Sequence, residues 1–262
     1  MAQWLKFEED CTNYLNKKFG DRAVFFHFGG EDSTISDIQV TTNAGRKFYI
    51  DAKLTPAQCG QFVLIPNVAN RCFVFSDKNK TNLTPQVQAI VKHMNADFEA
   101  YKEAGTSGKE IELNDGGKTF CEWIVSTYVQ KGAEFIITNN YTILPIRDFA
   151  KYFDVTATYR VKRSGSSSVG KGNLPYVTQH IRKAEYPVSK FLAEGSKLFV
   201  YSSANLHNKR FVLGEYEYMF SQRGDRFEIR KLSNTFNANV IFSIFNKNQN
   251  GLTDTEFITE LK

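Results

Sequence analysis

The sequence predicts an α/β (α+β) fold in which helices flank a mixed β-sheet and a β-rich C-terminal region follows. Two observations indicate this fold. In the first half of the chain, segments with apolar residues at helical spacing alternate with short strand-like runs. After Lys197 the chain becomes rich in strand-like runs separated by turn residues. With 262 residues, of which 42% are hydrophobic, the chain is long and apolar enough for a sizeable core.

Four helices are predicted. The first begins at Trp4, carries apolar residues at helical spacing, and is stopped by Gly20, a residue type that commonly follows a helix. The second, after Pro85, shows the same spacing, and the fourth opens with Pro145, which suits a first helical turn. The predicted helices are Trp4–Phe19, Pro85–Ala104, Lys118–Gln130 and Pro145–Phe153.

Ten segments are predicted to be strands. The second and third form a hairpin around Asn43-Ala44-Gly45, and a polar loop at 105–117 separates the two long helices. The fourth is expected to be short and buried. The predicted strands are Ala23–Phe28, Ile35–Thr41, Lys47–Leu54, Arg71–Ser76, Ala133–Thr138, Val155–Arg163, Leu198–Ser202, Arg210–Phe220, Arg226–Leu232 and Val240–Phe245.

Composition indicates a soluble globular protein. No apolar run approaches the roughly 18 residues of a transmembrane helix, and the N-terminal residues lack the apolar stretch of a secretory signal. We therefore expect a cytoplasmic location. The four cysteines are widely spaced and form no Cys-x-x-Cys pair, so we expect reduced, mostly buried thiols and no zinc site. They are Cys11, Cys59, Cys72 and Cys121.

Two carboxylates and one lysine occur on the two strands of the predicted hairpin. Because side chains alternate between the faces of a strand, Asp51 and Lys53 point the same way, while their apolar neighbours point into a core. Asp37, on the preceding strand, supplies the second carboxylate. Two carboxylates suit Mg²⁺, and a nearby lysine can orient or activate a water. Together these groups could catalyse the hydrolysis of a phosphodiester bond. The structural alternative is that Asp51 and Lys53 form an exposed ion pair and that Asp37 is an ordinary residue at a strand edge.

The site depends on the register of the hairpin. A symmetric turn at Ala44-Gly45 would pair Asp37 with Ala52, on the face opposite Asp51. An odd-length loop or a bulge is needed to bring the two carboxylates together. Gly45 can supply it, since three-residue hairpin loops commonly use a left-handed glycine. We therefore predict such an irregularity.

Basic residues collect in one segment. Residues 155–184 contain six Lys or Arg and no Asp or Glu, around a loop rich in serine and glycine. Glycine lets backbone N–H groups approach a phosphate, and Arg, Lys and Asn can bond base edges. A mobile, solvated loop is the alternative. The basic residues are Arg160, Lys162, Arg163, Lys171, Arg182 and Lys183.

Alternation along the strand at 155–163 places Val161 inward and makes Arg160 and Lys162 the first candidates for a DNA groove. Where this strand meets the loop, we expect Arg163 to turn outward together with Ser164 and Ser166. The predicted DNA-binding residues are Arg160, Lys162, Arg163, Ser164, Ser166, Lys171 and Asn173.

The run from Ser36 to Val40, followed by Asp51-Ala52-Lys53, resembles the PD-(D/E)xK nuclease superfamily, with Ser36 where the family often has proline. The resemblance covers roughly residues 1–76. It implies that Asp37 and Asp51 bind Mg²⁺, with the backbone carbonyl of Ala52, and that Lys53 positions or activates water.

The same resemblance implies further site residues. A glutamate of the first helix often completes the family's site, and Glu8 matches it, with Glu9 as the competitor. A glutamine after the lysine recurs in several branches, which makes Gln58 and Gln61 candidates. The strand and loop at 159–166 resemble a DNA-contacting strand of type II restriction endonucleases.

The resemblance implies a restriction-endonuclease-like core and a Mg²⁺-dependent type II restriction endonuclease acting on double-stranded DNA at a short specific sequence. Residues 1–153 would form the nuclease core, and residues 154–262 the DNA-recognition and β-rich region, packed with the core as one globular unit. A repair or recombination nuclease that reads DNA structure is one alternative. A non-catalytic nucleic-acid-binding module with this fold is another. Both a monomer and a homodimer fit the sequence.

Overall fold

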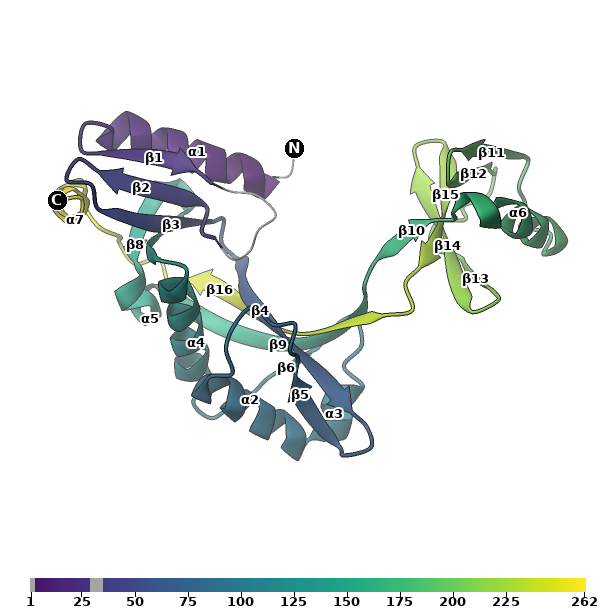
Figure 1. The fold of residues 1–262 in the computed structure, drawn as a ribbon, viewed down its shortest axis with the longest axis horizontal. Helices are drawn as coiled ribbons and strands as arrows, with labels where there is room; N and C mark the ends of the chain where they lie inside the picture. The colour runs from purple at the N-terminus through teal and green to yellow at the C-terminus, as the bar shows by residue number, and fades with distance from the viewer. Residues whose placement is uncertain (1–2, 29–34) are drawn as a thin grey trace. The chain divides into compact units, whose positions relative to one another are not determined.

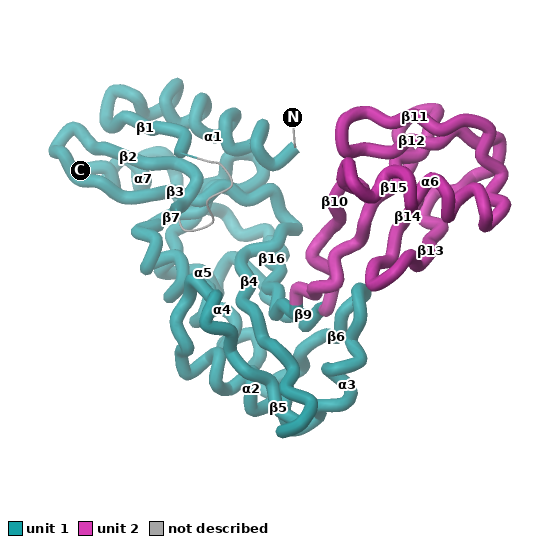
Figure 2. Tube along the Cα trace, turned by 45° about the vertical axis from the view of Figure 1, so that its right-hand side comes forward, with its two compact units in different colours: residues 1–160, 238–262 teal, residues 161–237 magenta. Residues whose placement is uncertain are grey.

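The computed structural model describes residues 3–28 and 35–262, and it divides into two compact units (Figure 2). Unit 1 comprises residues 1–160 and 238–262, and unit 2 comprises residues 161–237. The predicted division differs from this one, because the chain returns to unit 1 for its last strand and helix. Packing of both parts as one globular unit stays a prediction. Within the described residues, no helix has the length and apolar character needed to cross a membrane.

The first sheet of unit 1 is mixed, as predicted. Its order is β1-β2-β3-β7-β8 (Figure 1). The first three strands are antiparallel neighbours, β3 and β7 are parallel, and β8 returns antiparallel to β7. The strands are β1 (Ala23–His27), β2 (Ile38–Thr42), β3 (Lys47–Lys53), β7 (Ala133–Thr138) and β8 (Thr142–Pro145).

Two helices from opposite ends of the chain cover this sheet. They are α1 (Gln3–Phe19) and α7 (Asp254–Glu260). Phe257 of α7 packs edge-on against Phe19 and Phe135, at centroid distances of 5.0 and 5.4 Å. Leu15 of α1 and Ile50 of β3, both fully buried, belong to the same core. This core fixes the strands that carry the candidate carboxylates.

The second sheet of unit 1 has the order β5-β4-β16-β9-β6. Trp123 stacks on Phe242 of β16 at 4.3 Å and lies 5.5 Å from Phe62 of β4. The strands are β4 (Ala57–Asn67), β5 (Cys72–Phe75), β6 (Lys109–Glu110), β9 (Phe153–Arg163) and β16 (Phe236–Asn246). The helices that follow β5 and precede β9 are α2 (Pro85–Ala96), α3 (Phe98–Lys102), α4 (Gly116–Gln130) and α5 (Phe149–Tyr152).

Unit 2 has its own sheet and core. The sheet order is β11-β12-β15-β14-β13, and β10 pairs with β15. Val177 and Ile181 of α6 are buried against Phe220 and Ile229 of the sheet. The elements are β10 (Ser166–Ser168), α6 (Leu174–Lys183), β11 (Lys190–Glu194), β12 (Lys197–Tyr201), β13 (Arg210–Leu213), β14 (Tyr216–Arg223) and β15 (Arg226–Leu232).

Several predicted elements need correction. The helix at 85–104 is two helices, because Asp97 has φ −125° and ψ 50°, which are not helical angles. The strand at 210–220 is a hairpin that turns at Gly214, with φ +63°. The helix at 145–153 shrinks to one 3₁₀ turn, Ile146–Asp148, and α5. The serine–glycine loop contains β10 and a 3₁₀ turn (Lys171–Asn173), and α6 follows it. The strand at 71–76 is only half buried, with Val74 46% exposed.

Candidate active site

The hairpin β2–β3 brings Asp37, Asp51 and Lys53 together, as predicted. Lys53 Nζ lies 2.6 Å from Asp51 Oδ2 and 3.7 Å from Asp37 Oδ2, so one ammonium group faces both carboxylates. All three side chains are largely buried, with 5% of Asp51, 16% of Asp37 and 20% of Lys53 exposed. This is a sheltered cluster rather than the exposed ion pair of the alternative interpretation.

The predicted irregularity of the hairpin is confirmed. Ile38 pairs with Ile50, so Asp37 and Asp51, the next residues along the two strands, come opposite each other. The loop between Thr42 and Arg46 has three residues and ends with Gly45 at φ +83°, a left-handed conformation that favours glycine. An odd-length loop therefore places both carboxylates on one face.

Asp37 is held by the backbone of the facing strand. The N–H of Ala52 donates to Asp37 Oδ2 over 2.8 Å. Burial, followed by the negative charge of Asp51, raises the pKa of Asp37 to about 7, although Lys53 acts in the opposite direction. Both causes act against a second negative charge at this place, and a bound cation would offset it.

Glu8 lies on the buried stripe of α1, only 6% exposed, whereas Glu9 is half-buried. Glu8 Oε2 lies 3.2 Å from His27 Nε2 of β1. Burial raises the pKa of Glu8, although the hydrogen bond with His27 and the positive charge of Lys53 act to lower it. Glu8, rather than Glu9, therefore fits the predicted helix carboxylate.

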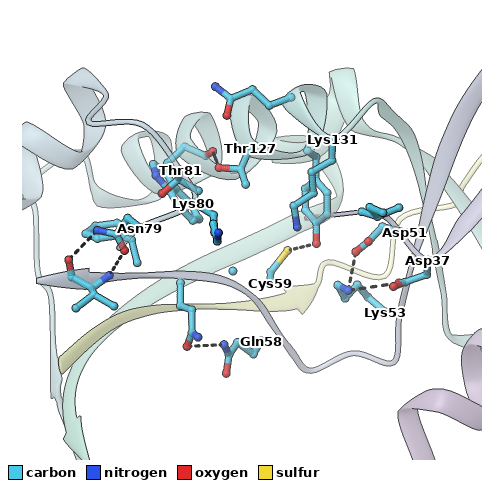
Figure 3. A pocket seen from close by; sticks show the side chains of 18 of the residues that line it. Asp37, Asp51, Lys53, Gln58, Cys59, Asn79, Lys80, Thr81, Thr127 and Lys131 are labelled. Atoms are coloured by element: carbon cyan, nitrogen blue, oxygen red, sulfur yellow. Dashed lines mark hydrogen bonds and ion pairs between the residues drawn. The ribbon is translucent and has the colours of Figure 1, made fainter. Parts of the chain in front are cut away.

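A cleft of about 620 Å³ opens beside the carboxylates (Figure 3). Both predicted glutamines line it, and Gln58 Nε2 donates to Gln61 Oε1 over 3.1 Å. They lie on β4, a strand that the sequence analysis did not identify. The pairing of β4 with β16 skips Cys59, since Phe242 faces Gly60 and the next residue, Ser243, faces Gln58. Cys59 is thus the extra residue of a β-bulge, a device that often re-aims side chains beside a site.

The wall behind Asp51 is made by α4 and the bulge. The thiol of Cys59 and the hydroxyl of Tyr128 lie 3.1 Å apart, and both residues line the cleft. Burial raises the pKa of the Cys59 thiol to about 12, so this sulfur is a neutral packing atom rather than a thiolate. The expectation of reduced cysteines agrees with four free thiols, of which Cys72 is half-buried and the others are buried.

The donor set fits a hard divalent cation. Asp51 Oδ2 is buried and lies 2.6 Å from the Lys53 ammonium group, which Asp37 Oδ2 also faces at 3.7 Å. Because two carboxylates share one ammonium group, negative charge remains that a cation would offset. Asp37 and Asp51 would hold Mg²⁺, completed by waters, as this ion prefers. Among residues 3–28 and 35–262, no three His, Cys, Asp or Glu side chains converge on a single metal position.

The predicted DNA-binding residues are distributed between the two units. Arg160, at the end of unit 1, is half-buried, whereas Lys162 and Lys171 of unit 2 are exposed. Arg163 does not turn outward: Nη1 lies 2.7 Å from Glu217 Oε2, and the guanidinium lies 5.5 Å from the ring centroid of Phe236. The positive charge of Arg163, in the segment without acidic residues, is therefore offset by Glu217 from a later part of the sequence.

The loop serines and Asn173 have structural partners. Ser164 Oγ donates to Asn237 Oδ1 over 3.1 Å. Ser166 Oγ accepts from Arg230 Nε over 3.2 Å, and Asn173 Nδ2 donates to the Val169 carbonyl over 3.1 Å. These contacts occupy some of the hydrogen-bonding groups of these three residues.

Sequence reasoning also missed three lysines that line the cleft. Lys78, Lys80 and Lys131 line it together with the carboxylates. A local signal for two of them was present, since Lys78-Asn79-Lys80 lies one residue after a predicted strand. Lys131 comes from the end of α4, and only the tertiary fold brings it to the same cleft.

Comparison with known proteins finds one informative similarity. The chain is 40% identical to HhaI endonuclease in a solved complex with DNA, with a TM-score of 0.73. The alignment covers 96% of this chain and 94% of the HhaI chain. No protein-family model matches, and no curated protein matches either.

Proposed function

The chain belongs to the restriction endonuclease family of HhaI endonuclease, and from this premise we propose that it is a Mg²⁺-dependent type II enzyme. It hydrolyses phosphodiester bonds in double-stranded DNA at a short specific sequence. The observation that carries the proposal is the cluster of Asp37, Asp51 and Lys53 beside a cleft, within a chain that matches HhaI endonuclease along nearly its whole length.

Asp37 and Asp51 hold the metal in this proposal, with the Ala52 carbonyl as the predicted third protein oxygen. When bound, Mg²⁺ stabilises charge on the scissile phosphate and lowers the pKa of a coordinated water. Ala52 contributes in a second way, because its N–H fixes the orientation of Asp37. Glu8, held by His27, supports the hydration shell or a second ion.

Lys53 positions the attacking water. Burial alone would lower the pKa of Lys53, but the negative charges of Asp51 and Asp37 outweigh it and raise the pKa above its ordinary value. A lysine that stays protonated donates hydrogen bonds and offsets phosphate charge. This favours orientation of water over proton removal by a neutral lysine. Gln61, with Gln58, lines the same cleft and is proposed to contact water or phosphate.

The test is digestion of one sequenced plasmid with and without Mg²⁺. Discrete bands that disappear in EDTA support a site-specific, metal-dependent endonuclease. A smear, or a preference for branched DNA, would instead favour a nuclease that reads DNA structure. Binding without cutting would identify a non-catalytic module. Sequencing the fragment ends then gives the recognition site and the cut position.

A further inference from the structure

The cleft beside the carboxylates carries a second group of charged side chains. Lys78, Lys80 and Lys131, here called the lysine rim, line it together with Asp37 and Asp51. Figure 3 labels Lys80 and Lys131. With Lys53 included, the described lining has four lysines and two aspartates. Unit 1 as a whole has the opposite balance, with 20 Lys or Arg and 22 Asp or Glu in residues 1–160 and 238–262. Positive charge is therefore concentrated in the cleft.

Two of the rim lysines lie on a loop that is pinned to β4. The side chain of Asn79 bonds both main-chain groups of Val63: Oδ1 accepts from the N–H over 2.7 Å, and Nδ2 donates to the carbonyl over 2.9 Å. The N–H of Asn79 also donates to the Ser76 carbonyl over 3.0 Å. Since Asn79 stands between Lys78 and Lys80, this clamp holds both lysines at the cleft.

Lys131 reaches the cleft from α4. Its N–H closes the last turn of that helix by donating to the carbonyls of Thr127 and Tyr128, at 3.3 and 3.0 Å. Its ammonium group lies 5.7 Å from the ring centroid of Tyr128. Within residues 3–28 and 35–262, no rim lysine forms an ion pair with a carboxylate. Three cations from two separate elements are thus available to an anionic ligand.

An unsatisfied hydroxyl lies at the same part of the cleft. Thr81 lines it next to Lys80, and Thr81 Oγ1 is buried without a hydrogen-bond partner among the described residues. Buried polar atoms nearly always have partners, so a group left without one indicates a missing ligand or water. A hydroxyl can donate to a phosphate oxygen, as serine and threonine commonly do at DNA backbones.

We propose that the lysine rim and the Thr81 hydroxyl bind the backbone phosphates next to the scissile one, on the strand that is cut. The inference rests on the proposed function, and it adds a binding role for residues that the metal chemistry does not use. The rim sets the register of the strand against Asp37 and Asp51, because phosphate contacts fix position without reading sequence. Its effect on affinity is therefore equal for cognate and random DNA.

The first experiment measures DNA binding without metal as a function of salt. Lys80→Ala and Lys131→Ala should each weaken binding about 3- to 10-fold and reduce the slope of log K against log salt by about one. The loss should be the same for a cognate and a random duplex. Lys17→Ala, an exposed lysine of α1 outside the cleft, is the matched control and should change neither quantity.

The second experiment localises the contact. Once the cut position is mapped, single methylphosphonates, which remove one phosphate charge, are placed around the scissile bond. A methylphosphonate at one flanking position should weaken the binding of DNA by the wild-type protein. The same methylphosphonate should cause no further loss of affinity in Lys80→Ala or Lys131→Ala. Equal additional losses at every position, or variants that match Lys17→Ala, would overturn the proposal. Failure of the proposed function would look different, because wild-type protein would then not cut with Mg²⁺ while its binding stays measurable.

Discussion

The backbone N–H of Ala52 donates to Asp37 Oδ2 across the β2–β3 hairpin over 2.8 Å. This bond ties a candidate metal ligand to the residue that separates Asp51 from Lys53. The same three-residue loop that sets the register of the hairpin therefore also sets the direction of the Asp37 carboxylate.

Removing either carboxylate charge should abolish cleavage. Asp37→Asn and Asp51→Asn keep the side-chain shape but weaken the binding of Mg²⁺, which prefers charged oxygen ligands. We expect no cleavage above background in a plasmid assay, and loss of wild-type activity in EDTA with recovery on adding Mg²⁺ or Mn²⁺. Circular dichroism should show an intact fold. Full activity of the wild-type protein in EDTA would contradict the metal mechanism.

Lys53→Ala should separate binding from cutting. Without the ammonium group, water is no longer oriented, and we expect single-turnover cleavage to fall by at least ~10²-fold while specific DNA binding persists. Lys53→Arg should not restore the rate, because the guanidinium has a different shape. Lys17→Ala provides the control for loss of one positive charge. A cleavage rate near that of the wild type for Lys53→Ala would remove the assigned role.

Arg160 and Lys162 stay the candidates for base recognition on β9. If either side chain contacts a base edge, replacement by alanine should cost about 1–3 kcal/mol for the cognate site and much less for random DNA. Competition binding with both duplexes measures this difference. Equal losses on both duplexes would mean phosphate contacts. Unchanged binding to both duplexes would mean that another part of the protein recognises the bases.

Gly60→Ala should deform the cleft. Gly60 has φ +148°, and a Cβ there would lie 2.8 Å from Trp123 Cζ3, whose ring is packed against Phe62 and Phe242. We expect a loss of about 1–3 kcal/mol in unfolding free energy and reduced cleavage. Gly117→Ala is the matched control, since a Cβ at this position in α4 meets nothing within 4 Å. If both variants unfold alike, the bulge does not depend on glycine.

Glu228 should make the stability of unit 2 depend on pH in the acidic range. The residue is 3% exposed, and its carboxylate accepts from Arg230 over 2.6 Å and from Arg223 over 3.2 Å. Burial acts to raise the pKa of Glu228, but the hydrogen bonds with Arg230 and Arg223 outweigh it and lower the pKa below its ordinary value. The stabilisation is therefore present above the unfolded-state pKa and is lost as pH falls through the lower folded-state value.

Glu228→Gln tests this dependence. The variant should be about 1–3 kcal/mol less stable than the wild type at pH 7, because two charge-assisted hydrogen bonds are weakened. Calorimetric unfolding should show the difference shrinking as the pH falls from the unfolded-state pKa through the lower folded-state value, where the wild-type carboxylate becomes protonated. Glu215→Gln, at an exposed carboxylate, should have little effect at either pH. A difference that does not change with pH would rule out the charged pair as its cause.

The local parts of the site could be predicted from sequence, and the tertiary parts could not. Alternation placed Asp51 and Lys53 on one face, and the glycine at position 45 allowed the odd loop that aligns Asp37. In contrast, β4 contains Gly60 and Pro66, which indicate a loop unless the bulge and the partner strand β16 are known. This wall of the cleft therefore could not be predicted, because β4 forms it only when paired with β16, a strand from far along the chain.

Two errors concern helices. The periodic apolar residues at 85–104 continue across Asp97, so periodicity could not reveal the break there. The opposite occurred at α6, where Leu174, Val177 and Ile181 have helical spacing, and Pro175 suits a first turn. This segment lies within the basic stretch expected to face DNA, and no helix was predicted there.

Unit 2 is an insertion in topological terms. The chain leaves unit 1 after Arg160 in β9 and re-enters it at Ala238 in β16, and these two strands are hydrogen-bonded neighbours. Neighbouring strands lie about 4.8 Å apart, a gap that a short link spans. The 77 residues 161–237 can thus be acquired, exchanged or lost through a single pair of junctions while the sheet that receives them keeps its strand order.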